Sequence, residues 1–306
     1  MRNLDHNFMT PFLCMAIINE LCGSDTSKPK NTGFSGKQCL EGLMEKVAVA
    51  RDGFSFDSLA DFKDKDKWLE AIANKDIVPL FDAYVVTPAN TDATQYTVGN
   101  FSFETASAVK ITTFESYLGF CSHAALKSYA NSEYTQVFEF NNDGSILGVG
   151  NEDGSVKGQD LKDLNVGIRT IATSDKPATT LVRLTYKDYN QLEDNAVVIK
   201  PSWSPADIDG IFDVELEFVS ATATTIKFKA TRECGHAPVL VLTTADVVVK
   251  NASGVVQTTS FVGADANGVY TLTGTAFATG YTVEIDGVVT VVDTLYEGVE
   301  PMPITV

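Results

Sequence analysis

The chain has 306 residues, 44% of them hydrophobic and 10% aromatic, and this balance indicates folded cores and excludes wholesale disorder. A chain of this length exceeds one small core, so it predicts two domains. The 40 acidic residues against 23 lysines and arginines give a net charge of −17, which argues against specific nucleic-acid binding and leaves only passive contact with passing DNA.

Residues 1–53 are predicted to form an N-terminal arm. Helical stretches are expected at Phe12–Leu21 and Gln38–Ala50, on either side of a polar loop from Gly23 to Gly36. The apolar run near the start contains Pro11 and is too short to span a bilayer. We therefore expect neither an export signal nor a membrane segment.

A helix from about 59 to 74 is predicted next. Ser58 precedes it and Asp61 follows Ser58 three residues later, which makes a weak capping box. The apolar residues that recur at helical spacing are Leu59, Phe62, Leu69 and Ile72. The run Ile77–Val86 follows, and its Pro79 indicates the start of a strand or an edge strand.

Alternation of apolar and polar residues dominates from about 97 to 200 and predicts antiparallel strands. Strands are expected at Val109–Glu115, Val137–Phe140, Leu181–Tyr186 and Ala196–Ile199, with a short helix at Ser122–Tyr129. Two Asp-Gly pairs, Asp143-Gly144 and Asp153-Gly154, suit tight hairpin turns because glycine adopts positive φ readily. Residues 54–205 are therefore predicted to form an α+β assembly domain rich in antiparallel strands.

Pro201 and Pro205 bracket small polar residues and predict a hinge, with a domain boundary near 205–212. Beyond it, strands are expected at Val214–Val219, Thr225–Ala230, Val239–Thr243, Val247–Lys250, Val269–Thr273 and Tyr281–Ile285. Their short length and regular spacing predict an immunoglobulin-like β-sandwich over residues 206–306, although the Cys…Trp…Cys pattern of antibody domains is absent. The predicted fold class is mainly β with some α.

The cysteines do not form a recognisable framework. They are Cys14, Cys22, Cys39, Cys121 and Cys234, an odd number at irregular spacing, which fits neither a set of disulfides nor a zinc site. We expect free thiols in a reducing cytoplasm. Nucleophilic catalysis has one weak candidate, Cys121-Ser122-His123, and no flanking motif supports it, so a half-buried thiol beside an ordinary histidine is the preferred interpretation.

Metal and cofactor sites are not predicted. The Asp-Gly turns and Asp207-Ile208-Asp209-Gly210 lack the spacing of a calcium loop, so turn chemistry is the preferred interpretation. Paired carboxylates such as Glu215 and Glu217 are expected on a solvated acidic face, and the glycines between Gly144 and Gly150 open no phosphate-binding helix. Trp68 and Trp203 are interpreted as a helix anchor and a hinge plug rather than as a carbohydrate-binding platform.

A resemblance to a known group of proteins emerges from residues 55–200. The stretch Trp68–Ile72 with the following Ile-Val-Pro-Leu strand, and the segment Phe138–Gly158 with its two Asp-Gly turns, resemble virion structural proteins of tailed phages that infect Bacteroidetes, the crAss-like group among them. The segment Asn267–Ile285 is similar to the closing strands of immunoglobulin-like modules in bacterial and phage proteins.

This resemblance implies a non-catalytic structural subunit of a phage virion, in the tail, tail tube or connector ring. Its partners would be further copies of itself, in a ring or tube, and other virion proteins, through exchange of the N-terminal arm and contacts between strand edges. It would be assembled in the host cytoplasm and located in the virion, with the immunoglobulin-like module facing outward. The alternatives are a capsid decoration protein, a bacterial surface or adhesion protein, and an enzyme or carbohydrate-binding module.

Overall fold

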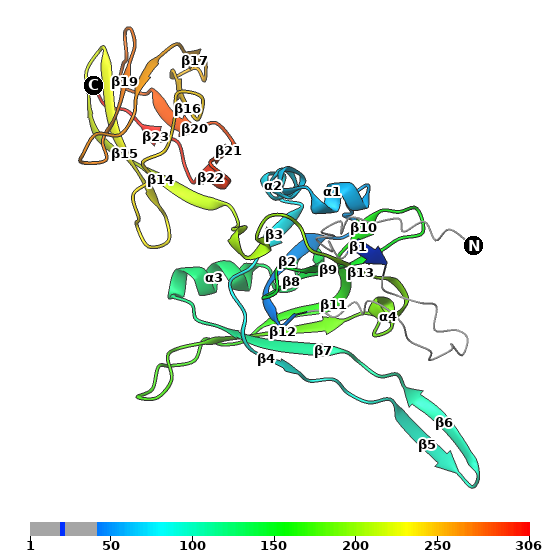
Figure 1. Cartoon of the computed structure of the whole chain (residues 1–306). Helices are drawn as coiled ribbons and strands as arrows, with labels where there is room; N and C mark the ends of the chain where they lie inside the picture. The colour runs from blue at the N-terminus through cyan, green and yellow to red at the C-terminus, as the bar shows by residue number, and fades with distance from the viewer. Residues whose placement is uncertain (1–18, 22–41) are drawn as a thin grey trace, which may run out of the picture.

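The computed structural model describes residues 19–21 and 42–306 (Figure 1). Strands make up 44% of the model and helices 12%, which confirms the prediction of a mainly β fold with some α. We call residues 42–205 the first part and residues 206–306 the second part. The boundaries that the sequence predicted at 53 and 205 stay predictions.

The first part is built around one large antiparallel sheet. Its strands are β1 (Asn19–Leu21), β2 (Met44–Arg51), β3 (Ile77–Pro79), β4 (Tyr84–Pro88), β7 (Ile111–Ser116), β8 (Tyr134–Asn141), β9 (Ile146–Gly150), β10 (Val156–Lys157), β11 (Gln159–Val166), β12 (Thr180–Tyr186) and β13 (Ala196–Ile199). The order is β1-β13-β9-β8-β11-β12-β7-β4, and β2, β3 and β10 join beside it. Two further strands, β5 (Thr94–Val98) and β6 (Phe101–Ala106), form a separate hairpin. The helices are α1 (Leu59–Lys63), α2 (Lys65–Ala73), α3 (Phe120–Ser128) and α4 (Gln191–Asn195).

Strand β8 is the branch point of this sheet, and both of its faces are buried. It pairs with β2 along one side and with β9 and β11 along the other. Phe138 and Phe140 belong to an aromatic core with Trp68 of α2, whereas Val137 points into the second core against α3 and β12. The sheet therefore separates two apolar cores.

Residues 44–51 correct the helix predicted at Gln38–Ala50, because they form strand β2. Val47 and Val49 face one core while Ala48 and Ala50 face the other, and all four are fully buried. A strand that is buried on both faces loses the alternation that distinguishes it from a helix. Of the helix predicted at Phe12–Leu21, residues 19–21 form strand β1 instead, and the rest lies outside the described residues.

The predicted helix at 59–74 is present as two helices with a break at Asp64. Ser58 caps α1 by accepting a 3.2 Å hydrogen bond from the Asp61 backbone N–H, and the Ser58 hydroxyl donates to the Asp61 carboxylate at 2.6 Å. Asp64 then caps α2 by accepting from the Asp66 N–H at 3.0 Å. The Ser58 cap is confirmed, while the Asp61 carboxylate bonds the Ser58 hydroxyl rather than closing the box on the Ser58 backbone N–H.

The two Asp-Gly pairs form the turns between β8 and β9 and between β9 and β10, as predicted. In the first turn Gly144 has φ of 80°, and the Asp143 carboxylate accepts from the N–H and the hydroxyl of Ser145. In the second turn Asp153 and Ser155 repeat these bonds. The aspartate oxygens thus accept hydrogen bonds within their own turns.

The second part consists of two sheets on one apolar core. Its strands are β14 (Phe212–Ala221), β15 (Thr225–Arg232), β16 (Val247–Lys250), β17 (Val256–Gln257), β18 (Ser260–Val262), β19 (Tyr270–Thr273), β20 (Thr282–Ile285), β21 (Val288–Val291), β22 (Thr294–Gly298) and β23 (Met302–Pro303). One sheet has the order β18-β19-β15-β14-β22-β21 and the other β17-β16-β20-β23. The strand predicted at Val239–Thr243 is wrong: this segment is irregular, although Val239 and Leu242 are buried in the core.

The connection between the parts begins with Pro201 and contains a short 3-10 helix, η1 (Pro205–Asp207). It leads directly into β14.

Candidate functional site: an exposed hairpin, a sheet edge and a junction

The hairpin formed by β5 and β6 carries apolar side chains on one face that contact no core. Tyr96 pairs across the hairpin with Phe103, and Val98 with Phe101, so the four side chains lie on the same face. Their exposed fractions are 62%, 56%, 52% and 70% in that order, and none belongs to a core cluster. The hairpin projects away from the sheet that carries it (Figure 1).

The opposite face of the hairpin is polar. It is formed by Gln95, Thr97, Ser102 and Glu104, and Ser102 exchanges hydrogen bonds with Thr97 and Gln95. An isolated two-stranded hairpin is marginally stable in water, because it has no core of its own. The apolar face is therefore an exposed hydrophobic patch on a projecting element.

The sequence contains a local signal for this hairpin, although no hairpin was predicted at this position. Gly99 and Asn100 separate two runs in which apolar and polar residues alternate, and Gly99 has φ of 60°. Gly-Asn between alternating runs is a two-residue hairpin signal.

Strand β1 covers an edge of the large sheet. Asn19, Glu20 and Leu21 pair with Ile199, Val198 and Val197 of β13. Only three residues make this contact, and the chain that joins them to β2 lies outside the described residues. The outer edge of β13 is therefore paired with a short strand that lies far from β13 in the sequence.

The second part rests on the first through the hairpin β21–β22. Val289 and Tyr296 on one face of this hairpin enter the core of the second part. Leu295, on the other face, is 1% exposed and enters the aromatic core of the first part, with Val288 packed beside it. Side chains of this one hairpin thus pack in the core of the second part and in the aromatic core of the first.

Two ion pairs flank this contact. Lys65 of α2 lies 2.7 Å from the Asp293 carboxylate, and Lys75 lies 2.9 Å from the Glu297 carboxylate. Exposed pairs of this kind contribute little to stability but fix the orientation of the surfaces they join.

Lys46 of β2 ties the connection between the parts to the large sheet. Its side chain is 5% exposed, and its ammonium group donates to the carbonyl oxygens of Ala206 and Ile208 at 3.2 and 2.7 Å and to the Asp209 carboxylate at 2.9 Å. The ammonium thus satisfies backbone carbonyl groups in η1 and in the residue that follows it.

A disulfide between Cys121 and Cys234 makes a further link between the parts. Cys121 lies in the first turn of α3 and Cys234 in the turn after β15, and the two are 113 residues apart in sequence with Cα atoms 5.8 Å apart. This pairing corrects the expectation of free thiols for these two cysteines. Cys14, Cys22 and Cys39 lie outside the described residues.

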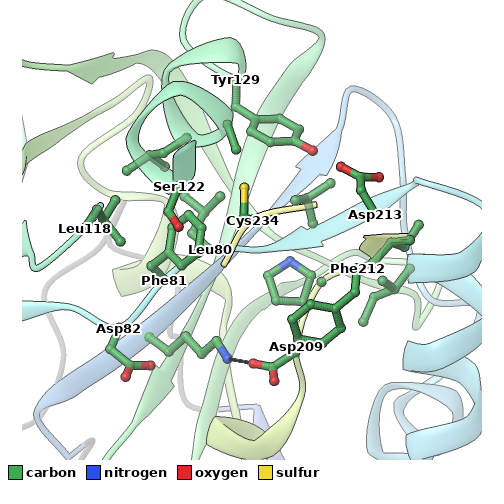
Figure 2. A pocket seen from close by; sticks show the side chains of 18 of the residues that line it. Leu80, Phe81, Asp82, Leu118, Ser122, Tyr129, Asp209, Phe212, Asp213 and Cys234 are labelled. Carbon is green, nitrogen blue, oxygen red and sulfur yellow. Dashed lines mark hydrogen bonds and ion pairs between the residues drawn. The ribbon is translucent and has the colours of Figure 1, made fainter. Parts of the chain in front are cut away.

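A cavity of about 610 Å³ lies at this junction. Its walls are α3, the segment after β3, and residues 209–213 with the Cys234 turn from the second part. Figure 2 shows Leu80, Leu118 and Phe81 on its apolar side, and it shows the bond between Lys46 and Asp209. Partial burial raises the pKa of Asp213, and the nearby carboxylates of Glu233 and Glu297 add to this effect, while Lys75 opposes it.

The residues considered as catalytic candidates are engaged elsewhere. Cys121 is part of the disulfide, and His123 lies with its Nδ1 2.9 Å from the Thr180 hydroxyl. Ser122 lines the cavity. The trio therefore does not form a nucleophile beside a base.

The remaining candidates have structural contacts. The Trp68 indole is fully buried and donates to the Phe62 carbonyl oxygen at 2.8 Å, and Trp203 donates to the Lys63 carbonyl oxygen at 2.8 Å. Glu215 and Glu217 lie on the exposed face of β14. Within residues 19–21 and 42–306, no group of three or more histidine, cysteine or acidic side chains is arranged to hold a metal ion.

Comparison of the sequence with protein-family models and with curated proteins finds no match. Among the helices of the described part of the chain, none combines the length and the apolar character that crossing a membrane requires.

Proposed function

We propose that this protein is a non-catalytic structural subunit of a phage virion, in the tail, tail tube or connector ring, that assembles with copies of itself. The observation that carries the proposal is the β5–β6 hairpin. Its apolar face has no partner within the described chain, and the whole hairpin carries one charged residue, Glu104. Copies with a net charge of −17 repel one another, so a nearly uncharged, apolar projection is the surface best suited to their contact.

The sheet edge at β13 supports the same proposal. A three-residue strand such as β1 can pair with β13 of its own chain or with β13 of a neighbour, because the backbone hydrogen bonds are the same in both cases. Exchange of this strand joins unlike surfaces of two copies, and the hairpin would supply a second contact between them. Contacts of this type close into a ring or extend into a tube.

We further propose that the second part is an immunoglobulin-like module. Its sheets contain β18-β19-β15-β14 and β17-β16-β20-β23, which correspond to the orders D-E-B-A and C′-C-F-G of that fold. The hairpin β21–β22 is then an insertion between the last two strands, and it pairs with β14 through β22. In the assembly this module would face outward, while acidic residues of the first part would line a passage for DNA.

A bacterial surface or adhesion protein is the second candidate, and one observation favours it. The Cys121–Cys234 disulfide is typical of oxidising compartments outside the cytoplasm. A surface protein would be monomeric in the assay below and would bind cells or glycans.

The test is light scattering and negative-stain electron microscopy of the purified protein and of a variant that combines Phe101→Ser with Phe103→Ser. Covering a phenylalanine contributes about 1.5–3 kcal/mol, so the loss of two should weaken each contact by at least about a hundredfold. We expect rings or tubes from the parent protein and monomers from the variant.

Two controls sharpen this test. Thr97→Ala with Ser102→Ala alters the polar face of the same hairpin and should leave assembly intact. Deletion of residues 1–21 removes β1 and should weaken assembly if the strand is exchanged between copies. A parent protein that stays monomeric at high concentration would contradict self-assembly.

A further inference from the structure

The Cys121–Cys234 disulfide joins the two parts by linking α3 to the turn after β15. The other contacts described above lie elsewhere. Lys46 holds residues 206–209 of the connection, and Leu295 with the two ion pairs lies at the β21–β22 hairpin against α2 and its C-terminal end. Cys234 instead lies in the tight turn after β15, where the Arg232 N–H donates to Ala237 O and Gly235 has φ of 94°. The disulfide is therefore separate from both the Lys46 bonds and the β21–β22 contact.

The cavity lies beside the disulfide. Cys234 lines it from the second part, while Ser122 and Tyr129 line it from α3, as Figure 2 shows. Partial burial at this position raises the pKa of Tyr129. If the turn that carries Cys234 moves away from α3, the cavity loses one wall.

We propose that Cys121 and Cys234 form a redox-dependent clasp that fixes the second part against α3 and keeps the cavity closed on this side. Both cysteines are solvent-exposed, so dissolved thiols and disulfides reach them. In the dithiol state the β21–β22 contact persists, because it contains no sulfur, and the turn at residues 232–237 separates from α3. The inference does not depend on the proposed assembly.

The chemistry requires a disulfide oxidant such as oxidised glutathione. The thiolate of one cysteine attacks a sulfur of the oxidant, and this forms a mixed disulfide and releases one glutathione thiolate. The second cysteine then attacks the mixed disulfide, forms the Cys121–Cys234 bond and releases the second glutathione. Two protein thiols are oxidised and one glutathione disulfide is reduced to two thiols.

The experiment uses the full chain with Cys14→Ser, Cys22→Ser and Cys39→Ser, so that no other thiol competes. The protein is reduced with a phosphine, or oxidised with glutathione disulfide, and examined by peptide mapping and by hydrogen exchange with mass spectrometry. We expect a linked Cys121–Cys234 peptide only after oxidation. We also expect faster exchange at residues 120–128 and 232–237 after reduction, with exchange in α2 and β21–β22 unchanged.

A matched variant that adds Cys121→Ser and Cys234→Ser should show the fast exchange under both conditions. Absence of the linked peptide after oxidation would overturn the proposal. So would equal exchange in the two redox states, because the disulfide would then hold nothing in place. Faster exchange throughout the chain after reduction would show a general stabilising cross-link and would also overturn a local clasp.

Discussion

Replacing Lys46 by methionine tests how the connection between the two parts is held. The substitution keeps the length and the apolar stem of the side chain but removes the ammonium group. That group makes three hydrogen bonds, to the carbonyl oxygens of Ala206 and Ile208 and to the Asp209 carboxylate. Ile208 is 1% exposed, so its carbonyl oxygen would have no ready access to water.

The expected loss follows from these contacts. A buried carbonyl left without a donor costs about 1–3 kcal/mol, and the loss of a charged donor adds to this. The Asp209 side chain is 59% exposed, so its ion pair with Lys46 is screened by water and contributes little. We therefore expect Lys46→Met to lower the free energy of unfolding by about 3 kcal/mol.

Denaturant unfolding followed by tryptophan fluorescence measures this change, because Trp203 lies in the same connection. Lys67→Met is the matched control: Lys67 is exposed and contacts Glu70 on the same helix at 2.8 Å, so its replacement should leave the free energy of unfolding nearly unchanged. Equal stabilities for the two variants would refute the role assigned to Lys46.

Two further predictions concern the junction and can be tested by thermal unfolding. Val292 and Asp293 form the two-residue turn of β21–β22 with φ of 48° and 65°, and a β-branched residue is strained at positive φ. Val292→Asn should therefore raise the free energy of unfolding by about 1 kcal/mol. A lower free energy of unfolding would contradict the backbone strain assigned to Val292. Asp213 has a raised pKa, so its carboxyl group binds a proton more tightly when folded, and its ionisation destabilises the fold as pH rises through the folded pKa. Asp213→Asn should therefore raise the melting temperature at pH 7 and leave it unchanged near pH 3, which is below the pKa of this group in both the folded and the unfolded chain. A variant that is stabilised near pH 3 and not at pH 7 would contradict this reasoning.

The elements that were predictable from the sequence are those whose signal is local. The capping residue Ser58 and the two Asp-Gly turns depend on bonds between neighbouring residues, and the structure has them where they were expected. Strand β2 was predicted as a helix because its two faces are covered by α2 and α3, contacts that its own residue pattern does not reveal.

The candidate sites were harder to predict than the fold. The disulfide joins cysteines 113 residues apart, and nothing in their spacing indicates the pairing. Lys46 sits in a strand next to Val47 and has no local partner, so only the path of the connection reveals its role. The exposed hairpin had a usable turn signal, but its exposure depends on where the rest of the sheet ends.

The hairpin β21–β22 has a consequence for how this molecule can be divided. Because Leu295 completes the aromatic core of the first part, a fragment that ends at residue 205 would leave a vacancy where this side chain packs. The second part in isolation would in turn expose that leucine to water. Heat should therefore melt both parts in one cooperative step, and a domain exchange would succeed only if the incoming sandwich carried an equivalent hairpin.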